Sequence, residues 1–323
     1  MNILITGGAG YIGSHVVKLL GQTTQHNIIV LDNLSTGFQH AILYGKLVIC
    51  DLSIIKEVEK IFQHNNFDII IHFAASIDVS ESLSNPLKYY ENNTLNSINL
   101  IKMALKYKVK KFIFSSTAAV YGNSKKMFVN ENDDTQPLNP YGWSKLMTER
   151  ILMDMVGDTQ DFEYIILRYF NVAGASADGK LGSYNKNATH LINMATKVVV
   201  GELEEMFVFG NTYNTKDGTC IRDYIHIDDL ASAHLKAVEY SGSGIFNCGY
   251  GQGYSVKEVI ETMKKVSGKD FKINIVGKRI GDIEAIVADN KKILTKMQWH
   301  PQYNDLDFIC KSSLDWYKKQ CAM

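Results

Sequence analysis

The sequence has no excess of charge of either sign, because 34 Lys and Arg residues balance 34 Asp and Glu residues. Without a net positive field, the chain lacks the electrostatic attraction that draws proteins to nucleic acids or anionic membranes. It also has no apolar run approaching the ~18 residues of a membrane-spanning helix, and no basic segment with a cleavage site at its start. We therefore expect no nucleic-acid partner, no membrane attachment and a cytoplasmic location.

Cysteine is scarce and scattered. None of the cysteines is spaced as C-x-x-C, and they stand at Cys50, Cys220, Cys248, Cys310 and Cys321. This pattern predicts free thiols in a reducing compartment and argues against a disulfide scaffold or a zinc site. The histidines lack metal-ligand spacing as well, although His226 and His234 lie near Asp223, Asp228 and Asp229. We interpret that segment as a capped turn between a strand and a helix rather than as a metal site.

What the sequence does contain is a glycine turn close to its start. An apolar run typical of a buried strand, Asn2–Ile5, precedes Gly7, Gly10 and Gly13, and an amphipathic stretch, Tyr11–Leu20, begins within the turn. Glycines at this spacing allow a tight turn, close approach of a pyrophosphate to the backbone, and close packing of helix on strand. The start of the helix also offers unpaired N–H groups to phosphates. This pattern predicts a dinucleotide-binding site.

Short apolar runs alternate with amphipathic stretches through the first half of the chain. The predicted strands are Asn2–Ile5, Ile28–Leu31, Leu47–Cys50, Asp68–Phe73, Lys111–Ser115 and Tyr164–Leu167. The predicted helices are Tyr11–Leu20, Ile54–Phe62, Pro86–Tyr107 and Tyr141–Met155. This alternation is typical of an α/β fold in which helices cover both faces of a parallel, doubly wound Rossmann sheet.

The pattern changes near residue 171. Beyond that point the segments are mixed, which favours a smaller α+β substrate-binding domain, and glycine-rich loops recur near 174–182, 210–218, 242–253 and 277–281. We therefore predict a dinucleotide-binding domain at 1–170 and a substrate-binding domain at 171–323. The segment 221–240 has the pattern of a strand followed by a capped helix. We expect it to return to the first domain, so that the two domains interleave.

Asp32 indicates which dinucleotide the turn accepts. It follows the second predicted strand, where a carboxylate accepts hydrogen bonds from the hydroxyls of the adenosine ribose. A carboxylate there repels a 2′-phosphate, and no Arg lies beside it in Asp32-Asn-Leu-Ser-Thr-Gly37, so NAD is favoured over NADP. Asp51, after the third strand, has two interpretations. It accepts a hydrogen bond from the adenine amino group, or it caps the helix that follows.

A tyrosine and a lysine four residues apart share one helix face and form a base suited to carbonyl–hydroxyl redox chemistry. The lysine charge favours the phenolate, so we expect it to lower the tyrosine pKa from its usual value of about 10. The spacing occurs at Tyr107/Lys111, Tyr121/Lys125 and Tyr141/Lys145. Tyr141 follows Pro140 at the start of a long predicted helix, whereas the other pairs lie at a helix end and a turn. We select Tyr141 and Lys145, with the Thr117 hydroxyl directed at the reacting oxygen.

Further motifs run in one order through nearly the whole chain. They are Thr6-Gly-Gly-Ala-Gly-Tyr-Ile-Gly-Ser-His15, Leu31-Asp-Asn33, Ile71-His-Phe-Ala-Ala75, Tyr89-Tyr-Glu-Asn-Asn93, Phe114-Ser-Ser-Thr-Ala-Ala-Val-Tyr-Gly122, Pro140-Tyr-Gly-Trp-Ser-Lys145, Leu167-Arg-Tyr-Phe-Asn171, Asp217-Gly-Thr219, Ile221-Arg-Asp-Tyr-Ile-His226 and Gly281-Asp282. Through these motifs the chain resembles the extended short-chain dehydrogenase/reductases and, within them, the UDP-galactose (UDP-hexose) 4-epimerases.

The resemblance implies a reaction in which Tyr141 removes the proton of the sugar 4-hydroxyl while hydride passes to NAD. The 4-keto sugar then turns over, and hydride returns to its opposite face. The implied NAD contacts are Gly7, Gly10, Tyr11, Ile12, Gly13, Asp32, Asn33, Asp51, Leu52, Phe73, Ala74, Ala75, Asn93, Thr117, Tyr141, Lys145 and Phe170. The implied UDP-sugar contacts are Thr117, Tyr141, Asn171, His190, Leu191, Phe209, Arg222, Arg279, Asp282 and Ile286. A homodimer formed by the helices near 86–107 and 141–155 is also implied.

Two of these contacts have structural alternatives. The guanidinium groups of Arg222 and Arg279 suit a diphosphate. Taken singly, however, each residue is equally consistent with a surface arginine or with one that bridges the two domains. Phe209 stacks on uracil or belongs to the core, and both interpretations stay open.

Three positions depart from the pattern of the family. Ile77 stands where a Lys often reaches the cofactor phosphates, and His190 replaces an Asn near the uridine diphosphate. Ile286 stands where a bulky Tyr closes the sugar pocket in some relatives. Because Ile is smaller, we hypothesise that the pocket accepts a 2-acetamido group. The chain would then convert UDP-N-acetylglucosamine and UDP-N-acetylgalactosamine as well as UDP-glucose and UDP-galactose.

Other functions of related and unrelated classes are alternatives to epimerisation. A 4,6-dehydratase needs an Asp-Glu acid/base pair after the active-site Thr, and this chain has Ala118-Ala119, which cannot transfer protons. UDP-uronate epimerases and decarboxylases of the same family remain alternatives. A non-catalytic NAD-binding sensor is a candidate of another class, but a sensor has no need of the base formed by Tyr141 and Lys145.

Overall fold

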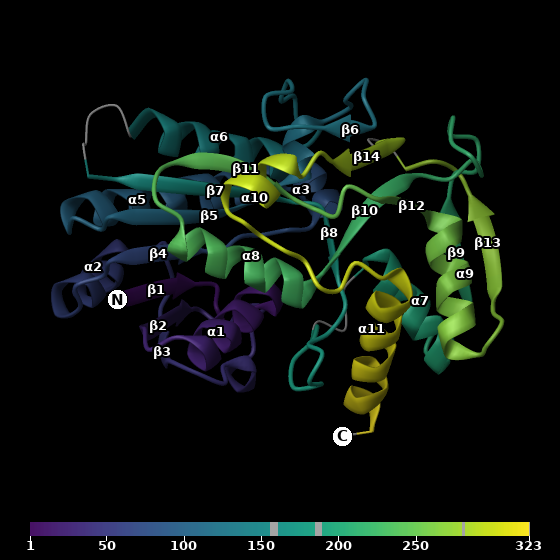
Figure 1. The fold of residues 1–323 in the computed structure, drawn as a ribbon, viewed down its shortest axis with the longest axis horizontal. Coiled ribbons are helices and arrows are strands. Elements are labelled where there is room, and N and C mark those ends of the chain that lie inside the picture. The colour runs from purple at the N-terminus through teal and green to yellow at the C-terminus, as the bar shows by residue number, and fades with distance from the viewer. Residues whose placement is uncertain (156–160, 185–188, 280–281, 323) are drawn as a thin grey trace.

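A parallel β-sheet forms the larger part of the molecule (Figure 1). The computed structural model describes residues 1–155, 161–184, 189–279 and 282–322. Within these residues seven strands form the sheet in the order β3-β2-β1-β4-β5-β7-β11. Their bounds are β1 Asn2–Thr6, β2 Asn27–Asp32, β3 Lys46–Ile49, β4 Ile69–His72, β5 Lys111–Thr117, β7 Glu163–Tyr169 and β11 Gly244–Cys248. The order reverses between β1 and β4, which is the switch point at which doubly wound sheets bind ligands.

Both faces of this sheet are buried beneath helices. Ile3 and Ile5 of β1 pack in one core with α1 (Tyr11–Thr23) and α8 (Ile227–Glu239). Leu4 packs in a second core on the opposite face, under α2 (Ile55–His64), α5 (Asn96–Lys106) and α6 (Pro140–Met155). Burial of successive side chains on opposite faces explains why these strands are continuously apolar. The predicted α/β Rossmann fold is confirmed.

The predicted strands each match a strand of the sheet within two residues at either end. The prediction missed β11, because it treated 242–253 as a glycine-rich loop. Residues Gly244–Cys248 instead pair in parallel with Ile165–Tyr169 of β7 and extend the sheet at its edge. The apolar part of this strand is short and flanked by glycines, so its strand character depends on pairing with β7.

The prediction of one regular helix over Pro86–Tyr107 is wrong, because a π-helical segment interrupts it. The structure has α4 (Pro86–Tyr89), a π-helical segment η2 (Tyr90–Leu95) and then α5. The buried Asn93 lies within η2 and hydrogen-bonds to neighbouring segments through its side chain. An inserted residue of this kind widens one turn and often lies at a functional site.

A smaller lobe lies at the end of the molecule opposite the N-terminus, where Figure 1 shows β9, β13, α7 and α9. One sheet of the lobe contains β12 (Gly253–Ser255), β10 (Ile221–His226), β14 (Ala285–Ala288) and β6 (Phe128–Val129), with β8 (Asn171–Ala173) beside β10. A second sheet pairs β9 (Glu205–Phe209) with β13 (Lys272–Val276). The remaining helices are α3 (Val79–Ser84), α7 (Leu191–Val200), α9 (Val256–Ser267), α10 (Lys291–Lys296) and α11 (Leu306–Cys321), and two short turns are η1 (Gln39–Ala41) and η3 (Ala118–Tyr121).

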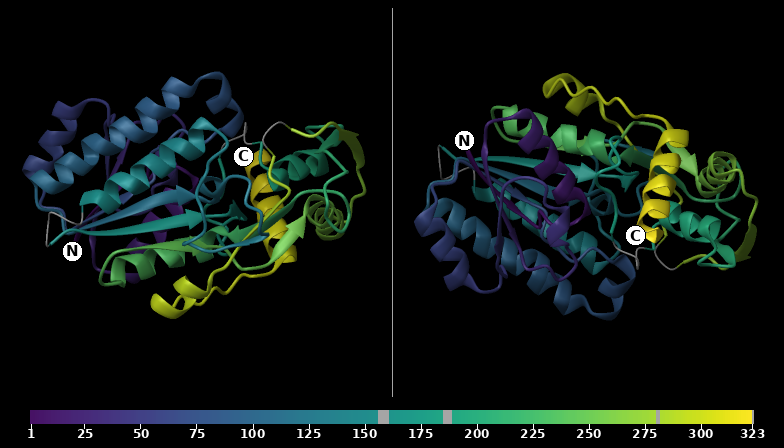
Figure 2. Two further views of the ribbon diagram at one scale, coloured as in Figure 1. Left: turned by 90° about the horizontal axis from the view of Figure 1, so that it is seen from above. Right: turned by 90° about the horizontal axis from the view of Figure 1, so that it is seen from below.

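The chain crosses between the two parts more than once. After β10, α8 and β11 return to the large sheet, where α8 packs on α1. In the opposite sense, β6 from the first half pairs with β14 of the lobe. Both views in Figure 2 show α11, the yellow helix that ends at the C-terminus, between the sheet and the lobe. Among the described residues, none of the helices combines the length and apolarity that crossing a bilayer requires.

Candidate active site

The glycine turn lies between β1 and α1 and has no room for side chains at two of its positions. Gly7 has φ +72°, and a Cβ there would lie 2.5 Å from the Ala74 nitrogen. A Cβ at Gly13 would lie 2.4 Å from the Gly7 carbonyl oxygen. Gly10 begins α1 without a side-chain cap, so the first N–H groups of the helix, at Tyr11 and beyond, are left to a ligand. These features fit a dinucleotide phosphate.

Asp32 lies at the end of β2, next to the glycine turn. Its carboxylate accepts hydrogen bonds from the backbone N–H groups of Ala9 and Leu34, both at 2.9 Å. Each carboxylate oxygen has a second lone pair, so the side chain can hold the turn and still accept from a ribose hydroxyl. This arrangement suits NAD, as the sequence predicted.

Asp51 is not the cap of α2. The residue that precedes the helix is Ile54, whereas the Asp51 carboxylate accepts hydrogen bonds from the Ser53 N–H at 2.8 Å and the Asn33 amide at 2.7 Å. These hydrogen bonds lower the pKa of Asp51 below its ordinary value. The interpretation as a helix cap is therefore wrong. Asp51 and Asn33 lie together at the carboxyl ends of β2 and β3.

The other predicted cofactor residues follow the carboxyl ends of neighbouring strands. Phe73, Ala74 and Ala75 follow β4, Leu52 follows β3 and Phe170 follows β7. Ile77, the departure from the family pattern, is exposed.

The Asn93 side chain fixes the segment that follows β4. Its carbonyl oxygen accepts from the Ser76 N–H at 2.7 Å, and its amide donates to the Ser76 carbonyl and the Ser144 hydroxyl. The π-helical turn thus connects the segment after β4 to α6. Asn93 itself is buried, and its amide is committed to protein partners in this structure.

Tyr141 lies in the first turn of α6, close to Thr117 at the end of β5. Burial raises the pKa of Tyr141 above its usual value, and a hydrogen bond with Thr117 opposes that rise. The expected net lowering of this pKa is therefore wrong, because desolvation of the phenolate by burial outweighs the hydrogen bond that favours it.

Lys145 is buried one turn further along α6. Its ammonium group donates to the Ser115 carbonyl at 2.8 Å and lies 4.9 Å from the centre of the Phe114 ring. Burial lowers the pKa of Lys145 to about 7, although the nearby carboxylate of Glu149 favours the charged form. The lysine thus titrates near neutral pH, where small changes in its surroundings alter its charge.

The other two tyrosine–lysine pairs do not form such a site. Tyr107 directly follows α5, and its hydroxyl contacts Glu59, while Lys111 donates to the backbone carbonyls of Val238 and Tyr240 at the end of α8. Tyr121 is buried and donates to Asn247, whereas Lys125 is exposed.

The predicted diphosphate and uracil residues gather in the smaller lobe. Arg222 of β10 lies 3.4 Å from Asp282, and the Arg279 guanidinium lies 3.6 Å from the centre of the Phe209 ring. Phe209 is thus a partly buried residue at the end of β9 whose ring is covered by Arg279. Gly281, from the same motif as Asp282, lies outside the described residues.

The remaining predicted sugar residues lie around the junction of the two parts. Asn171 is exposed at the start of β8, and His190 and Leu191 form the start of α7. Ile286 of β14 is almost fully buried in an apolar cluster that includes Phe170. Position 286 therefore shares an apolar cluster with Phe170, the predicted cofactor residue that follows β7.

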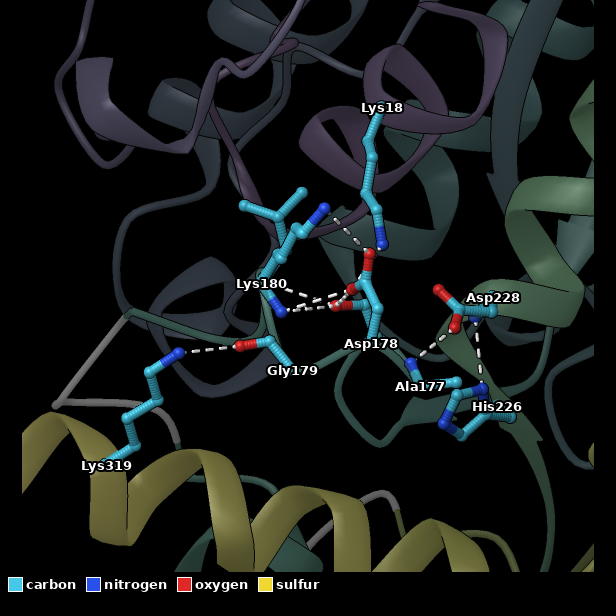
Figure 3. A network of polar contacts seen from close by, with 10 residues as sticks. Lys18, Ala177, Asp178, Gly179, Lys180, His226, Asp228 and Lys319 are labelled. Atoms are coloured by element: carbon cyan, nitrogen blue, oxygen red, sulfur yellow. Dashed lines mark hydrogen bonds and ion pairs between the residues drawn. The ribbon is translucent and has the colours of Figure 1, made fainter. Parts of the chain in front are cut away.

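The segment around His226 is a capped turn, as interpreted from the sequence. The His226 side chain accepts from the Asp228 N–H at the start of α8, and Asp228 accepts from the Ala177 N–H at 2.8 Å. Figure 3 shows this turn beside the ion pair that joins Lys18 of α1 to Asp178 at 2.6 Å. No group of three or more His, Cys, Asp or Glu residues within the described ranges is arranged to hold a metal.

Sequence reasoning missed a buried polar network behind the predicted catalytic pair. Glu149 of α6 forms an ion pair with Arg168 of β7 and accepts from the Ser116 hydroxyl of β5. A signal was available, because Glu149 follows Lys145 by four residues and so shares its helix face. The buried His72 is also hydrogen-bonded, to the Thr6 hydroxyl at 2.6 Å and to a serine of α5.

Comparison with known proteins places this geometry among nucleotide-sugar enzymes. Residues 3–249 match the NAD dependent epimerase/dehydratase family. A UDP-glucose 4-epimerase of Azospirillum brasilense is 43% identical over 97% of this chain and 91% of its own length. The UDP-Glc/GlcNAc 4-epimerase of Campylobacter jejuni is 50% identical, with a TM-score of 0.87 over 98% of this chain and 99% of that one. The Bifidobacterium longum UDP-glucose 4-epimerase in complex with NAD⁺ and UDP is 37% identical, with a TM-score of 0.93 over 99% of each chain.

Proposed function

Because the chain belongs to the NAD dependent epimerase/dehydratase family, we propose that it inverts C4 of UDP-hexoses through a transient 4-keto sugar. It would thereby interconvert UDP-glucose and UDP-galactose. The observation that carries the proposal is the position of Tyr141 and Lys145. Both project from the first turns of α6, beside Thr117 at the carboxyl end of β5. That end of a doubly wound sheet is where its ligands bind.

The chain's own residues would hold the cofactor and move the proton. The glycine turn would bind the pyrophosphate, and Asp32 would bind the adenosine ribose. NAD, when bound, accepts hydride from the sugar and returns it. Tyr141 would take the proton of the 4-hydroxyl as phenolate and, after the keto sugar has turned over, return it to the same oxygen while hydride returns to the opposite face of C4. Thr117 would donate a hydrogen bond to the reacting oxygen, and the charge of Lys145 would favour the phenolate.

We assign the nucleotide sugar to the smaller lobe. Arg222 and Arg279 offer guanidinium groups to the diphosphate, since planar guanidinium suits phosphate oxygens. In the structure Arg222 is paired with Asp282, and Arg279 lies over the Phe209 ring. Substrate would therefore replace protein contacts with phosphate contacts. On this proposal, residues 1–170 with 221–240 bind NAD and residues 171–323 bind the UDP-sugar.

This chain lacks the acid and base residues that a 4,6-dehydratase would need. Ala118 and Ala119 begin η3, directly after Thr117, at the position where a dehydratase carries its acid and base. Methyl groups cannot transfer protons, so an oxidised sugar in this pocket would be reduced again rather than lose water. Epimerisation is therefore the better-supported reaction.

We also propose that the pocket accepts 2-acetamido sugars. Ile286 leaves more room than a tyrosine would, and the similar Campylobacter jejuni enzyme is named for both UDP-Glc and UDP-GlcNAc. The test is to incubate the purified protein with each of the four UDP-sugars and separate the products by chromatography. We expect both pairs to reach their equilibrium mixtures, and no conversion of UDP-N-acetylglucosamine would contradict the dual range.

Replacing Ile286 by Tyr should separate the two substrate pairs. The added ring is expected to lower kcat/KM for the acetylated pair by at least about tenfold, the usual scale of steric discrimination in a pocket. The other pair should change much less. Ile286→Val keeps a small side chain in the same apolar cluster and serves as the matched control. Equal losses for both pairs in Ile286→Tyr would show that the residue does not select the substrate.

A homodimer through the helices near 86–107 and 141–155 is a further part of the proposal. Large apolar side chains are exposed on these helices, namely Leu87, Leu95, Trp143, Met147 and Met153. Exposed apolar surface of this kind is typical of a protein interface.

The four buried cysteines are free thiols, which agrees with our proposal of the reducing cytoplasm as the location.

Leu95→Glu should convert the proposed dimer to a monomer, because a carboxylate would be desolvated in the interface. Light scattering coupled to size-exclusion chromatography measures the mass. We expect twice the chain mass for the wild type and the chain mass for the variant. Phe207→Glu introduces the same charge at an exposed apolar position of the smaller lobe and should remain dimeric. A monomeric wild type would refute the dimer.

A further inference from the structure

An ion pair with both partners buried lies directly behind the catalytic pair. The Arg168 guanidinium binds the Glu149 carboxylate in a bidentate manner, with N–O distances of 2.6 Å and 3.0 Å. The side chains are only 4% and 1% exposed. Buried ion pairs of this kind give little net stability compared with apolar residues, because both charges lose their hydration. Stability alone therefore does not account for this pair.

The pair joins the elements that carry the predicted catalytic groups. Glu149 belongs to α6, as do Tyr141 and Lys145, while Arg168 belongs to β7. The Ser116 hydroxyl of β5 donates to the same carboxylate, and Ser116 directly precedes Thr117. Glu149 thus connects α6, which carries Tyr141, to β5, which carries Thr117.

A second layer of hydrogen bonds holds the arginine. Arg168 donates to the Tyr121 hydroxyl at 3.0 Å, and Tyr121 donates in turn to the Asn247 side chain of β11 at 2.6 Å. Its guanidinium also lies 4.9 Å from the centre of the Tyr121 ring. Because the arginine that binds it is itself held by Tyr121, the Glu149 carboxylate has little freedom to move.

We propose that Glu149 is a positioning residue for the reaction, which fixes α6 against β5 through Ser116 and against β7 through Arg168, and which places a buried negative charge one turn from Lys145. The inference rests on the proposed function, since it concerns the same catalytic lysine. Glu149 favours the charged form of Lys145, and by fixing α6 it also sets the distance between Tyr141 and Thr117.

The groups around Lys145 show why this charge matters. From β5 the lysine meets the Ser115 carbonyl and the Phe114 ring, which are neutral, and from its own helix it faces Tyr141 and Glu149. From β4 it faces His72, whose pKa burial lowers to about 3, so that this imidazole is uncharged at neutral pH. Burial lowers the pKa of Lys145 to about 7, and Glu149 is the carboxylate that opposes this effect.

The decisive variant is Glu149→Gln, which keeps the shape and removes the charge. Lys145 should then lose its proton at lower pH. The alkaline limb of the profile of kcat/KM against pH should move to lower pH by about one to two units, as expected for a charge roughly 6–10 Å away at an effective dielectric of ~20. Asp154→Asn, which removes an exposed carboxylate from the same helix, is the matched control and should leave the profile unchanged.

Two further variants separate charge from position. Glu149→Asp keeps the charge but shortens the side chain, and Ser116→Ala removes the link to β5. Both should lower kcat severalfold while the alkaline limb stays in place. They also keep the inference testable if Glu149→Gln does not fold, because wild-type kcat in both would overturn it.

A readout that does not depend on activity completes the test. In cofactor-free protein with ¹³C-labelled lysine, NMR titration follows the Lys145 signal, which Lys145→Met identifies. The signal should titrate at lower pH in Glu149→Gln than in the wild type or Asp154→Asn. An unchanged titration in folded Glu149→Gln would overturn the inference. A wild type that converts no UDP-hexose would instead overturn the proposed function, and the titration would still report on Glu149.

Discussion

Replacing Tyr141 by Phe is expected to reduce epimerisation by about 10³–10⁴-fold while NAD stays bound, the upper range for loss of a catalytic acid–base group. The substitution removes the hydroxyl that would take the proton of the sugar and leaves the ring. The glycine turn and Asp32 are untouched, so cofactor content should not change. Turnover of UDP-galactose measures the first quantity, and the absorbance of NAD released from the denatured protein measures the second.

Tyr107→Phe is the matched control for this variant. Tyr107, directly after α5, belongs to another pair with the same spacing, and its hydroxyl contacts Glu59 of α2. Its loss should leave kcat close to that of the wild type. If Tyr141→Phe kept a tenth or more of the wild-type rate, the assignment of Tyr141 as the base would have to be abandoned. Loss of NAD together with activity would point instead to a damaged pocket.

Gly13→Ala is expected to abolish cofactor binding and to destabilise the fold by about 1–3 kcal/mol, the usual cost of overpacking a rigid site. The added methyl group would lie 2.4 Å from the Gly7 carbonyl oxygen and 2.7 Å from the Gly8 Cα. Both neighbours are backbone atoms, so they cannot rotate away. To relieve the contact, α1 must move from the turn, and its N–H groups would no longer meet the phosphates.

Urea unfolding and NAD content test this variant together. Gly277→Ala is the control, because a Cβ at Gly277 would meet no atom within 4 Å. The control should keep both its unfolding midpoint and its cofactor. A Gly13→Ala protein that retained NAD and wild-type stability would show that the turn adapts. The pyrophosphate assignment would then lose its geometric basis.

Local patterns in the sequence were sufficient for the first half of the fold. Each strand buried on both faces is a short apolar run, and the helices repeat their apolar positions with helical spacing. Such patterns depend on neighbours in the chain, so they predicted β1 through β7 of the large sheet within two residues. The glycine turn was predictable for the same reason, since a tight turn constrains the residues that form it.

Features that depend on distant residues were not predictable in this way. Gly244–Cys248 becomes a strand by pairing with β7, about eighty positions earlier in the chain, and the π-helical turn at Asn93 depends on Ser76 and Ser144. Whether Asp51 caps α2 was open until its partners Ser53 and Asn33 were known. In each case a hydrogen bond to another segment decided the local structure.

The sequence by itself determined the fold class, the preference for NAD and the residues proposed for catalysis, because each depends on residue types at fixed short spacings. Only the tertiary structure decided the protonation chemistry of those residues. Burial raises the pKa of Tyr141 and lowers that of Lys145, and Glu149 with Arg168 sets the charge behind them. Desolvation and Coulomb interactions depend on distances in space, and a spacing along the chain does not contain them.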